Sequence, residues 1–470
     1  MPELDMNALN DIQGNLLRGY NMDFAKYLFY RWETPRQGRE WVKKLFPDIT
    51  TSAPWPNGNK PASALNVAFT YRGLNALGLS PNALASFPNE FKQGMAARAA
   101  ILGDFGENDP AKWDEVLGST NVHALVIVHA ISDDIRRKVT DDVKKRGKNV
   151  EGVTLLFEED AAGLADHKEH FGFKDGISQP LIENADALFG VPPSTGGGKR
   201  TKAGDWAPLK AGEFILGYED ESGRVASLLK PIPSAITEPD PTALLLPSPE
   251  ALWKNGTFLV FRKLQQDVAR FRDSMKEKAA DVFPGDSKGH ERLGALMMGR
   301  WPSGCPVDLS SVTDDATKGD ENNFWFDKDP KGEKCPLGAH IRRTNPREGP
   351  DPDPQNLTPN DPALGSHRHR LIRRGMPYGP KFDDKDAKEQ KRGLFFIALN
   401  ASIARQFEFL QGFWVNSGEF QGLDRTDRDP IIGGNRDDRD PNTDDPRKFT
   451  MPGTDKQFPW AFNLPEFVTT

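Results

Sequence analysis

The order of strand-like and helix-like segments in the first 160 residues constrains the fold of this chain more than any other feature. Val122–Ile131 is a near-continuous apolar run typical of a buried strand, and an amphipathic stretch with one polar face follows it. Strand-like segments also lie at Met22–Trp32, at Asn66–Tyr71 and in "GVTLLFEED", and a helix-like stretch, "TPRQGREWVKKLF", separates the first two. Strand, helix, strand occurs twice, which predicts a split-βαβ, ferredoxin-like unit.

The second half of the chain repeats this order loosely. Its strand-like segments are Glu213–Asp220, Gly256–Leu264 and Arg392–Asn400, and its helix-like segments are "QQDVARFRDSM", "GHERLGALMMGRW" and "SIARQFEFLQGFWV". A Gly-rich, cationic segment, "PPSTGGGKRTKAGD", joins the halves. We therefore expect an α+β fold of two ferredoxin-like halves, residues 1–190 and residues 205–470. Two acidic, Pro-rich segments, beginning "NPREGPDPDP" and "RTDRDPIIGG", are expected to be long loops.

Charge and cysteine content exclude several classes of protein. The 61 basic and 68 acidic residues give a net charge of −7, which argues against nucleic-acid binding. The two cysteines, Cys305 and Cys335, cannot form a disulfide framework and are expected to be free thiols. The start of the chain lacks the pattern of a signal peptide, and no apolar run is long enough to span a bilayer. We expect a soluble cytoplasmic protein without a membrane partner, with unusual export or packaging in a larger assembly left open.

The segment "FGFKDGISQP" places Asp175 between two glycines and before a proline. Asp-Gly is typical of a turn, because Gly176 adopts positive φ at little cost. An ordinary turn with a solvated carboxylate explains this pattern, and so does a backbone that approaches a ligand closely.

Among the eight histidines, His340 has the most unusual neighbours. In "CPLGAHIRRTNPR" it follows two small residues, which allow a large flat group to approach, and three arginines follow it. A single imidazole with nearby arginines for two carboxylates is what haem requires, but a histidine packed in the core explains the same pattern. In "LIRRGMPYGP" an apolar pair precedes two arginines and a tight turn, which is also compatible with the end of a strand.

Two other histidine pairs carry weaker signals. "DHKEH" does not match a zinc motif and is interpreted as a solvated helix end around Glu169. "HRHR" (His367 to Arg370) is interpreted as a surface charge cluster, because further zinc ligands at close spacing are absent.

Taken together and in this order, "GFKDGISQP", "CPLGAHIRRTNPR", "LIRRGMPYG" and "GLFFIALN" resemble the dye-decolorizing peroxidases, specifically the larger subtype shared by bacteria and fungi. "DIQGNLLRGY", "NVAFTYRGLNALGL" and "EFILGYEDE" also look like that family, so the resemblance covers most of the chain. It implies a dimeric α+β barrel-type architecture, with one haem b (iron protoporphyrin IX) per chain in the second half.

The resemblance also implies roles for individual residues. Asp175 matches the distal acid–base aspartate, Arg373 the distal arginine and His340 the proximal iron ligand. Arg347 matches a residue that contacts a haem propionate, and Arg342 is a second candidate for such a contact.

Further residues match the surroundings of the haem. Leu394 and Phe396 match the apolar pair of the distal pocket. The family places a carboxylate behind the proximal histidine, and here Asp429 and Glu408 are both candidates, with Asp429 preferred.

The implied activity is a peroxidase reaction. Hydrogen peroxide is reduced through a ferryl porphyrin-radical intermediate, and dyes, phenolics and other bulky aromatic reductants are oxidised. An acidic pH optimum is expected, because an aspartate stays a base at a pH where a histidine is protonated. Bulky reductants are expected to react at a distance, with Tyr378 and Trp414 as candidate electron relays, although core packing explains either residue as well.

A different function on the same fold is a haem-handling protein that releases iron or binds porphyrin. A functional pair of Asp175 and Arg373 would favour the peroxidase, because iron release has no evident need for a peroxide-splitting group. The sequence leaves open whether the protein is a monomer or a homodimer.

Overall fold

The computed structural model describes most of the chain, and the described residues are 3–185, 188, 196–201, 205–225, 249–347, 365–383, 390–434, 436–437, 440–444, 447–451, 460–464 and 466–470. Most of the segment that begins "NPREGPDPDP" and part of the segment that begins "RTDRDPIIGG" lie outside these residues, as does the predicted boundary at residue 190.

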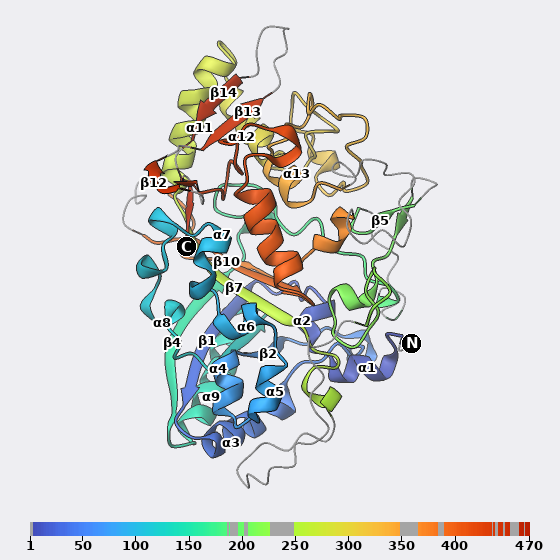
Figure 1. Cartoon of the computed structure of the whole chain (residues 1–470), viewed down its shortest axis with the longest axis vertical. Helices are drawn as coiled ribbons and strands as arrows, with labels where there is room; N and C mark the ends of the chain where they lie inside the picture. Colours follow the sequence, from blue (N-terminus) through green and yellow to red (C-terminus); the bar gives the residue numbers. More distant parts are fainter. Residues whose placement is uncertain are drawn as a thin grey trace.

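The first half of the chain forms a four-stranded antiparallel sheet (Figure 1). Its strands are β1 (Phe24–Trp32), β2 (Ser63–Phe69), β3 (Ala124–Ala130) and β4 (Val153–Ala162), in the spatial order β2-β3-β1-β4. The two longest helices of this half, α3 (Pro35–Leu45) and α9 (Asp133–Lys148), contact strands of the sheet. This is the predicted split-βαβ arrangement.

Local signals define both helices. Thr34 caps α3 with its side chain, and Gln37 completes a capping box. Ser132 caps α9, which has two aspartates in its first turn and basic residues in its last, as the helix dipole favours.

The second sheet belongs to the second half of the chain. Its strands are β7 (Phe258–Gln266), β8 (Ile372–Arg373), β9 (Met376–Tyr378), β10 (Gly393–Asn400) and β15 (Val468–Thr469), in the order β15-β7-β10-β8, with β9 also paired to β10. Two helices, α11 (Val268–Val282) and α12 (Gly289–Met298), follow β7. Beyond β10, residues Ala404–Glu408 and Leu410–Val415 form a helix with the wide i→i+5 pattern of hydrogen bonds.

The two sheets pack against each other through aromatic side chains. The ring of Tyr27 on β1 lies 4.5 Å from that of Phe395 on β10, and Phe29 lies 5.3 Å from Phe261 on β7. The predicted α+β architecture of two sheet-based halves is confirmed. The division at residues 190 and 205 stays a prediction.

One predicted strand is wrong. Residues Glu213–Asp220 form the end of a helical turn (Ala211–Glu213) followed by turns, not a strand. Gly217 has a φ of +98°, which interrupts extended backbone. The apolar side chains are buried nevertheless, because Phe214 and Ile215 pack in one core with Leu9 and Ile12 of the first half.

The remaining α-helices and strands are short. They are α1 (Met6–Asp11), α2 (Gly14–Leu17), α4 (Tyr71–Ala76), α5 (Pro81–Ala85), α6 (Asn89–Gln93), α7 (Ala99–Leu102), α8 (Glu115–Gly118), α13 (His340–Thr344), and the strand pairs β5 (Lys199–Arg200) with β6 (Trp206–Ala207), β11 (Arg436–Asp437) with β12 (Asp440–Asp444), and β13 (Lys448–Met451) with β14 (Trp460–Asn463). In the described part of the chain, no helix has the length and apolar character needed to cross a bilayer.

Candidate active site

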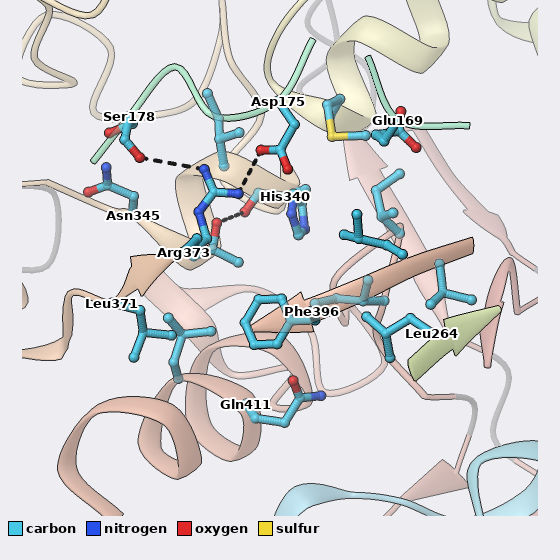
Figure 2. A pocket seen from close by; sticks show the side chains of 18 of the residues that line it. Glu169, Asp175, Ser178, Leu264, His340, Asn345, Leu371, Arg373, Phe396 and Gln411 are labelled. Carbon is cyan, nitrogen blue, oxygen red and sulfur yellow. Dashed lines mark hydrogen bonds and ion pairs between the residues drawn. The ribbon is translucent and has the colours of Figure 1, made fainter. Parts of the chain in front are cut away.

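A cavity of about 270 Å³ brings together residues from both halves of the chain (Figure 2). Its wall includes the segment from residue 169 to residue 180, the first residues of α13, and parts of β7, β8 and β10. Six of the predicted site residues line it: Asp175, His340, Arg347, Arg373, Leu394 and Phe396.

Asp175 and Arg373 form an ion pair on the cavity wall. Nη1 of Arg373, on β8, donates to Oδ1 of Asp175 over 2.7 Å, and the backbone N–H of Gly176 donates to the same oxygen over 2.6 Å. Gly172 and Gly176, on either side of Asp175, have φ values of +102° and +83°. Glycine is therefore required at these turns, and the turn that the sequence predicted is part of the cavity wall.

The environment of Asp175 keeps it ionised. Burial alone would raise the pKa of this carboxyl, but the charge and hydrogen bond of Arg373 outweigh burial and hold the pKa below its usual value. The side chains of Asp175 and Arg373 are 39% and 37% exposed, and because both line the cavity, they are open to a molecule inside it.

His340 is the first residue of α13, and a buried carboxylate lies behind its ring. Nδ1 of His340 lies 2.9 Å from Oδ2 of Asp429, whose other oxygen accepts the backbone N–H groups of Ile431 and Ile432. Burial lowers the pKa of His340, but the charge and hydrogen bond of Asp429 outweigh it and raise the pKa overall. With Nδ1 held in this way, Nε2 is the ring nitrogen left for a ligand in the cavity.

Of the two candidate carboxylates behind His340, Glu408 is wrong. Its two oxygens accept Nε and Nη2 of Arg98 over 2.7 and 2.6 Å. Asp429 occupies the predicted position.

A cluster of buried arginines lines another part of the cavity. Asn322 Oδ1 accepts Nη2 of Arg300 over 3.0 Å and Nη2 of Arg347 over 2.8 Å, and Arg370 lies on the same wall. Arg347 also donates to the carbonyl oxygen of Phe324 over 2.7 Å. Guanidinium groups match the geometry of carboxylates, so this cluster is a candidate site for an anionic ligand.

The predicted role of Arg342 conflicts with its position. Arg342 is not among the residues that line the cavity; Nη1 donates to Asp329 over 2.9 Å and to the carbonyl oxygen of Cys335 over 2.6 Å. Residues two apart on a helix point about 200° away from each other, so a side chain at this position is directed away when His340 faces the cavity.

Leu394 and Phe396 supply the apolar wall. They lie two residues apart on β10 and so share one face of the strand, which is the face that lines the cavity. Phe395 and Ile397, on the opposite face, belong to the core between the two sheets.

The two candidate relay residues lie outside the lining of the cavity. Tyr378, on β9, is buried with its ring 4.9 Å from that of Phe395, and burial raises the pKa of its hydroxyl. Trp414 is 9% exposed and lines a second hollow of about 510 Å³ together with Phe413, whose side chain is exposed. Nothing in these positions tests electron transfer, and both roles stay predictions.

Sequence reasoning missed several charged residues of the cavity wall, among them Arg300, Arg370 and Glu169. Arg300 and Arg370 carry no local pattern that separates them from other arginines. Glu169 was interpreted as part of a solvated helix end, but it lines the cavity, and the neighbouring His170 is buried with Nε2 2.9 Å from the carbonyl oxygen of Tyr378.

The "HRHR" segment is also less exposed than predicted. Burial is the largest cause that lowers the pKa of His367 to about 3 and that of His369 to about 4. The ring of His369 stacks on that of Phe409 at 3.9 Å, so the segment packs into the structure and is not a surface charge cluster.

Comparison with known proteins agrees with the geometry of the cavity. Residues 11–157 match the family model described as the DyP dimeric alpha+beta barrel domain. The chain is 31% identical over 459 residues to a dye-decolorizing peroxidase of Mycena epipterygia, covering 91% of this chain and 76% of that protein. It is 29% identical over 457 residues to the multifunctional dye peroxidase DyP2 of an Amycolatopsis species, covering 90% and 85%.

Solved structures give the same result over almost the whole chain. A decolorizing peroxidase of Auricularia auricula-judae superimposes with a TM-score of 0.75 at 25% identity, covering 98% of this chain and 95% of that one. An ancestral D-type dye-decolorizing peroxidase superimposes with a TM-score of 0.76 at 28% identity, covering 99% and 95%. The resemblance seen in the sequence is confirmed, and this chain belongs to the dye-decolorizing peroxidases, a family of haem peroxidases.

Proposed function

We propose that this protein binds one haem b per chain in the cavity and uses hydrogen peroxide to oxidise dyes, phenolics and other bulky aromatic reductants. The observation that carries the proposal is the meeting of two pairs in one cavity: the imidazole of His340 backed by Asp429, and the carboxylate of Asp175 bound to Arg373. When bound, haem supplies an iron that accepts peroxide and stores its oxidising equivalents.

The donor set of the cavity fits haem. Nε2 of His340 would hold the iron, and Asp429 would orient the ring and raise the basicity of the ligand. Arg347, with Arg300 and Arg370 on the same wall, would hold the two carboxylates of the porphyrin. Apolar side chains such as Leu394 and Phe396 would exclude water and keep the peroxide site narrow.

Asp175 is proposed to move the proton that peroxide cleavage requires. Its carboxylate would take a proton from one peroxide oxygen and return it to the other, which then leaves as water. Arg373 would stabilise the negative charge on the leaving oxygen and keep Asp175 ionised between turnovers.

The direction of the pKa shift of Asp175 supports an acidic working range. Because the pKa lies below its ordinary value, the carboxylate persists into acid and is lost only as the pH falls through that lowered pKa. Bulky reductants are too large for a narrow apolar site, so we propose that they react at the surface, with Trp414 beside its hollow and Tyr378 against Phe395 as the relays.

The decisive experiment mixes the haem-loaded protein with hydrogen peroxide in a stopped-flow spectrometer. We expect the wild type to form an oxidised species rapidly and Asp175→Asn and Arg373→Leu to form it at least about 100-fold more slowly. Equal rates in all three proteins would contradict the assigned roles. If the haem-loaded wild type does not react with peroxide, the result would instead favour a function in haem handling.

A further inference from the structure

Glu169 is a carboxylate in the cavity for which the proposed reaction has no role. It lies six residues before Asp175 on the same segment, and Figure 2 shows both residues on the wall of the cavity. A carboxylate removed from bulk water needs hydrogen-bond donors to be retained in its charged form. Its contacts therefore indicate what it does.

The side chain of Glu169 closes the turn that follows it. Oε2 accepts the backbone N–H of Phe171 over 2.8 Å, and Oε1 accepts that of Phe173 over 2.9 Å. Main-chain bonds close the same turn, from Gly172 N–H to the carbonyl of Glu169 and from Glu169 N–H to the carbonyl of Phe173. From β7, Gln266 Nε2 donates to Oε2 over 2.6 Å and fixes the carboxylate from outside the turn.

This turn determines where Asp175 lies. Asp175 is two residues beyond Phe173, and its backbone N–H donates to the carbonyl of His167 over 2.9 Å, so the segment doubles back on itself around Glu169. The rings of Phe171 and Phe173 pack against Phe271 of α11, at 4.5 and 6.3 Å, which anchors the turn on the protein. The negative charge of Asp175 also raises the pKa of Glu169.

We propose that Glu169 is a positioning residue for Asp175: its carboxylate holds the turn at residues 169–173 closed and thereby keeps Asp175 within hydrogen-bond distance of Arg373. The inference rests on the proposed function for the use of Asp175, but the clamp on the turn is a property of the chain itself.

The clamp depends on the charge of Glu169. A carboxylate accepts all three donors, whereas a carboxylic acid has a proton on one oxygen and accepts them less well. Burial, opposed by the hydrogen bonds from Phe171, Phe173 and Gln266, raises the pKa of Glu169 to about 7, and the charge of Asp175 adds to the rise. Gln266, its side-chain partner on β7, is uncharged. Besides Asp175, the charged or titratable residues that line the cavity are Asp104, Lys174, Arg262, Arg300, His340, Arg347, Arg370 and Arg373. The clamp is therefore tightest above about pH 7 and weaker below it, where the ion pair with Arg373 still holds Asp175 in its acidic working range.

Glu169→Gln is the informative variant because it keeps the shape of the side chain. Both oxygens of Glu169 accept a backbone N–H, so an amide NH₂ at either position leaves one donor of the turn without its acceptor. Gln266 can adapt, because its Oε1 has no hydrogen-bond partner in the described structure and can accept the new amide. The backbone of the turn cannot adapt in this way. Glu169→Gln thus imitates the protonated state of the wild type.

A matched control changes a similar clamp elsewhere. Asp220 Oδ1 accepts the backbone N–H groups of Ser222 and Arg224 over 2.8 and 3.1 Å, and Asp220 does not line the cavity. Asp220→Asn neutralises a carboxylate that clamps a turn outside the cavity, and its remaining oxygen can still accept both backbone groups, so it controls for the loss of charge alone.

The first measurement is hydrogen–deuterium exchange of the haem-loaded full chain, followed by mass spectrometry of the peptide that contains Phe171 and Phe173. After correction for the intrinsic effect of pH, we expect exchange in Glu169→Gln to be about tenfold faster than in the wild type at pH 8, and within about twofold of it at pH 5. Asp220→Asn should leave this peptide unchanged. Equal exchange in Glu169→Gln and wild type at pH 8 would overturn the clamp.

The second measurement is the rate of reaction with hydrogen peroxide at the same two pH values. We expect Glu169→Gln to react about tenfold more slowly than the wild type at pH 8 and at a similar rate at pH 5, with Asp220→Asn matching the wild type throughout. A rate in Glu169→Gln equal to that of the wild type at pH 8 would sink the inference. An equal slowing at both pH values would mean that Glu169 stays ionised at pH 5, which would contradict the weakening of the clamp in acid. A wild type that does not react with peroxide, yet shows the expected exchange, would refute the proposed function and leave the clamp standing.

Gln266→Leu keeps the test open if Glu169→Gln fails to fold. The hydrogen bond from Gln266 lowers the pKa of Glu169. Its loss in Gln266→Leu should therefore raise that pKa and move the midpoint of the pH-dependent exchange to a higher pH. An unmoved midpoint would contradict the inference.

Discussion

The contact between His340 and Asp429 allows a quantitative prediction about the cofactor. In Asp429→Asn, Oδ1 still accepts the N–H groups of Ile431 and Ile432, but an NH₂ replaces the oxygen that lies 2.9 Å from Nδ1 of His340. The imidazole then either loses its acceptor or adopts the tautomer with a proton on Nε2, which cannot bind a metal. Both outcomes weaken the histidine as an iron ligand.

The size of the effect follows from the loss of a negative charge behind the ligand. Removing the partner of a metal-bound histidine costs about 10- to 100-fold in metal affinity. The carboxylate stabilises the more highly charged ferric iron more than ferrous iron. If the whole loss falls on the ferric form, a tenfold change corresponds to about 59 mV for one electron, so the reduction potential should rise by roughly 60–120 mV.

The assay is a spectroelectrochemical titration of the haem-loaded variant beside the wild type, with haem retention measured on the same samples. Asp427→Asn is the matched control, because Asp427 is a buried neighbour whose oxygens accept from the backbone and side chain of Thr450 and not from His340. A potential and haem retention unchanged in Asp429→Asn, or changed equally in Asp427→Asn, would refute the reasoning.

Three further predictions concern the peroxide site and the relay. Arg373→Leu removes the charge that counteracts the effect of burial on the pKa of Asp175, so this pKa should rise. The acid limb of the pH–rate profile for the peroxide reaction, measured between pH 2 and pH 7, should then move to higher pH by about 1 unit or more. Gly172→Ala forces a residue with a Cβ atom to a φ of +102°, and no atom lies within 4 Å of that Cβ. The variant should therefore lose about 1–3 kcal/mol in the free energy of unfolding through backbone strain alone, as measured by denaturant unfolding. Trp414→Phe should slow the oxidation of a bulky dye severalfold while leaving the stopped-flow peroxide reaction unchanged, and equal dye turnover would argue against the relay.

Much of the fold was predictable because its signals are local. β3 is buried along its whole length and reads as an apolar run, and the helices α3 and α9 carry their own caps. The prediction of a strand at Glu213–Asp220 was wrong because an apolar run buried in a turn looks like a strand when only hydrophobicity is considered. Gly217 in that run was the available sign, since it adopts positive φ.

The candidate site was predictable where a residue has a distinctive local setting, and not where its meaning depends on tertiary contacts. Asp175 sits between glycines that its turn requires, and the structure brings it to Arg373 across 198 positions of the sequence. Glu169 has no such setting: only the fold shows that its oxygens meet two backbone donors and Gln266. The position of Arg342 also depends on the fold, because only the start of α13 at His340 shows that a residue two positions later is directed away from the cavity.

The alternation of β10 has a consequence for how this protein can change. Leu394 and Phe396 line the cavity, whereas Phe395 and Ile397 belong to the core between the two sheets. Residues that line the cavity and residues that hold the two sheets together thus alternate along one strand. Variation at Leu394 and Phe396 can therefore change the shape of the cavity while Phe395 and Ile397 keep the two sheets packed, so these two positions suit a mutant library that seeks new oxidations.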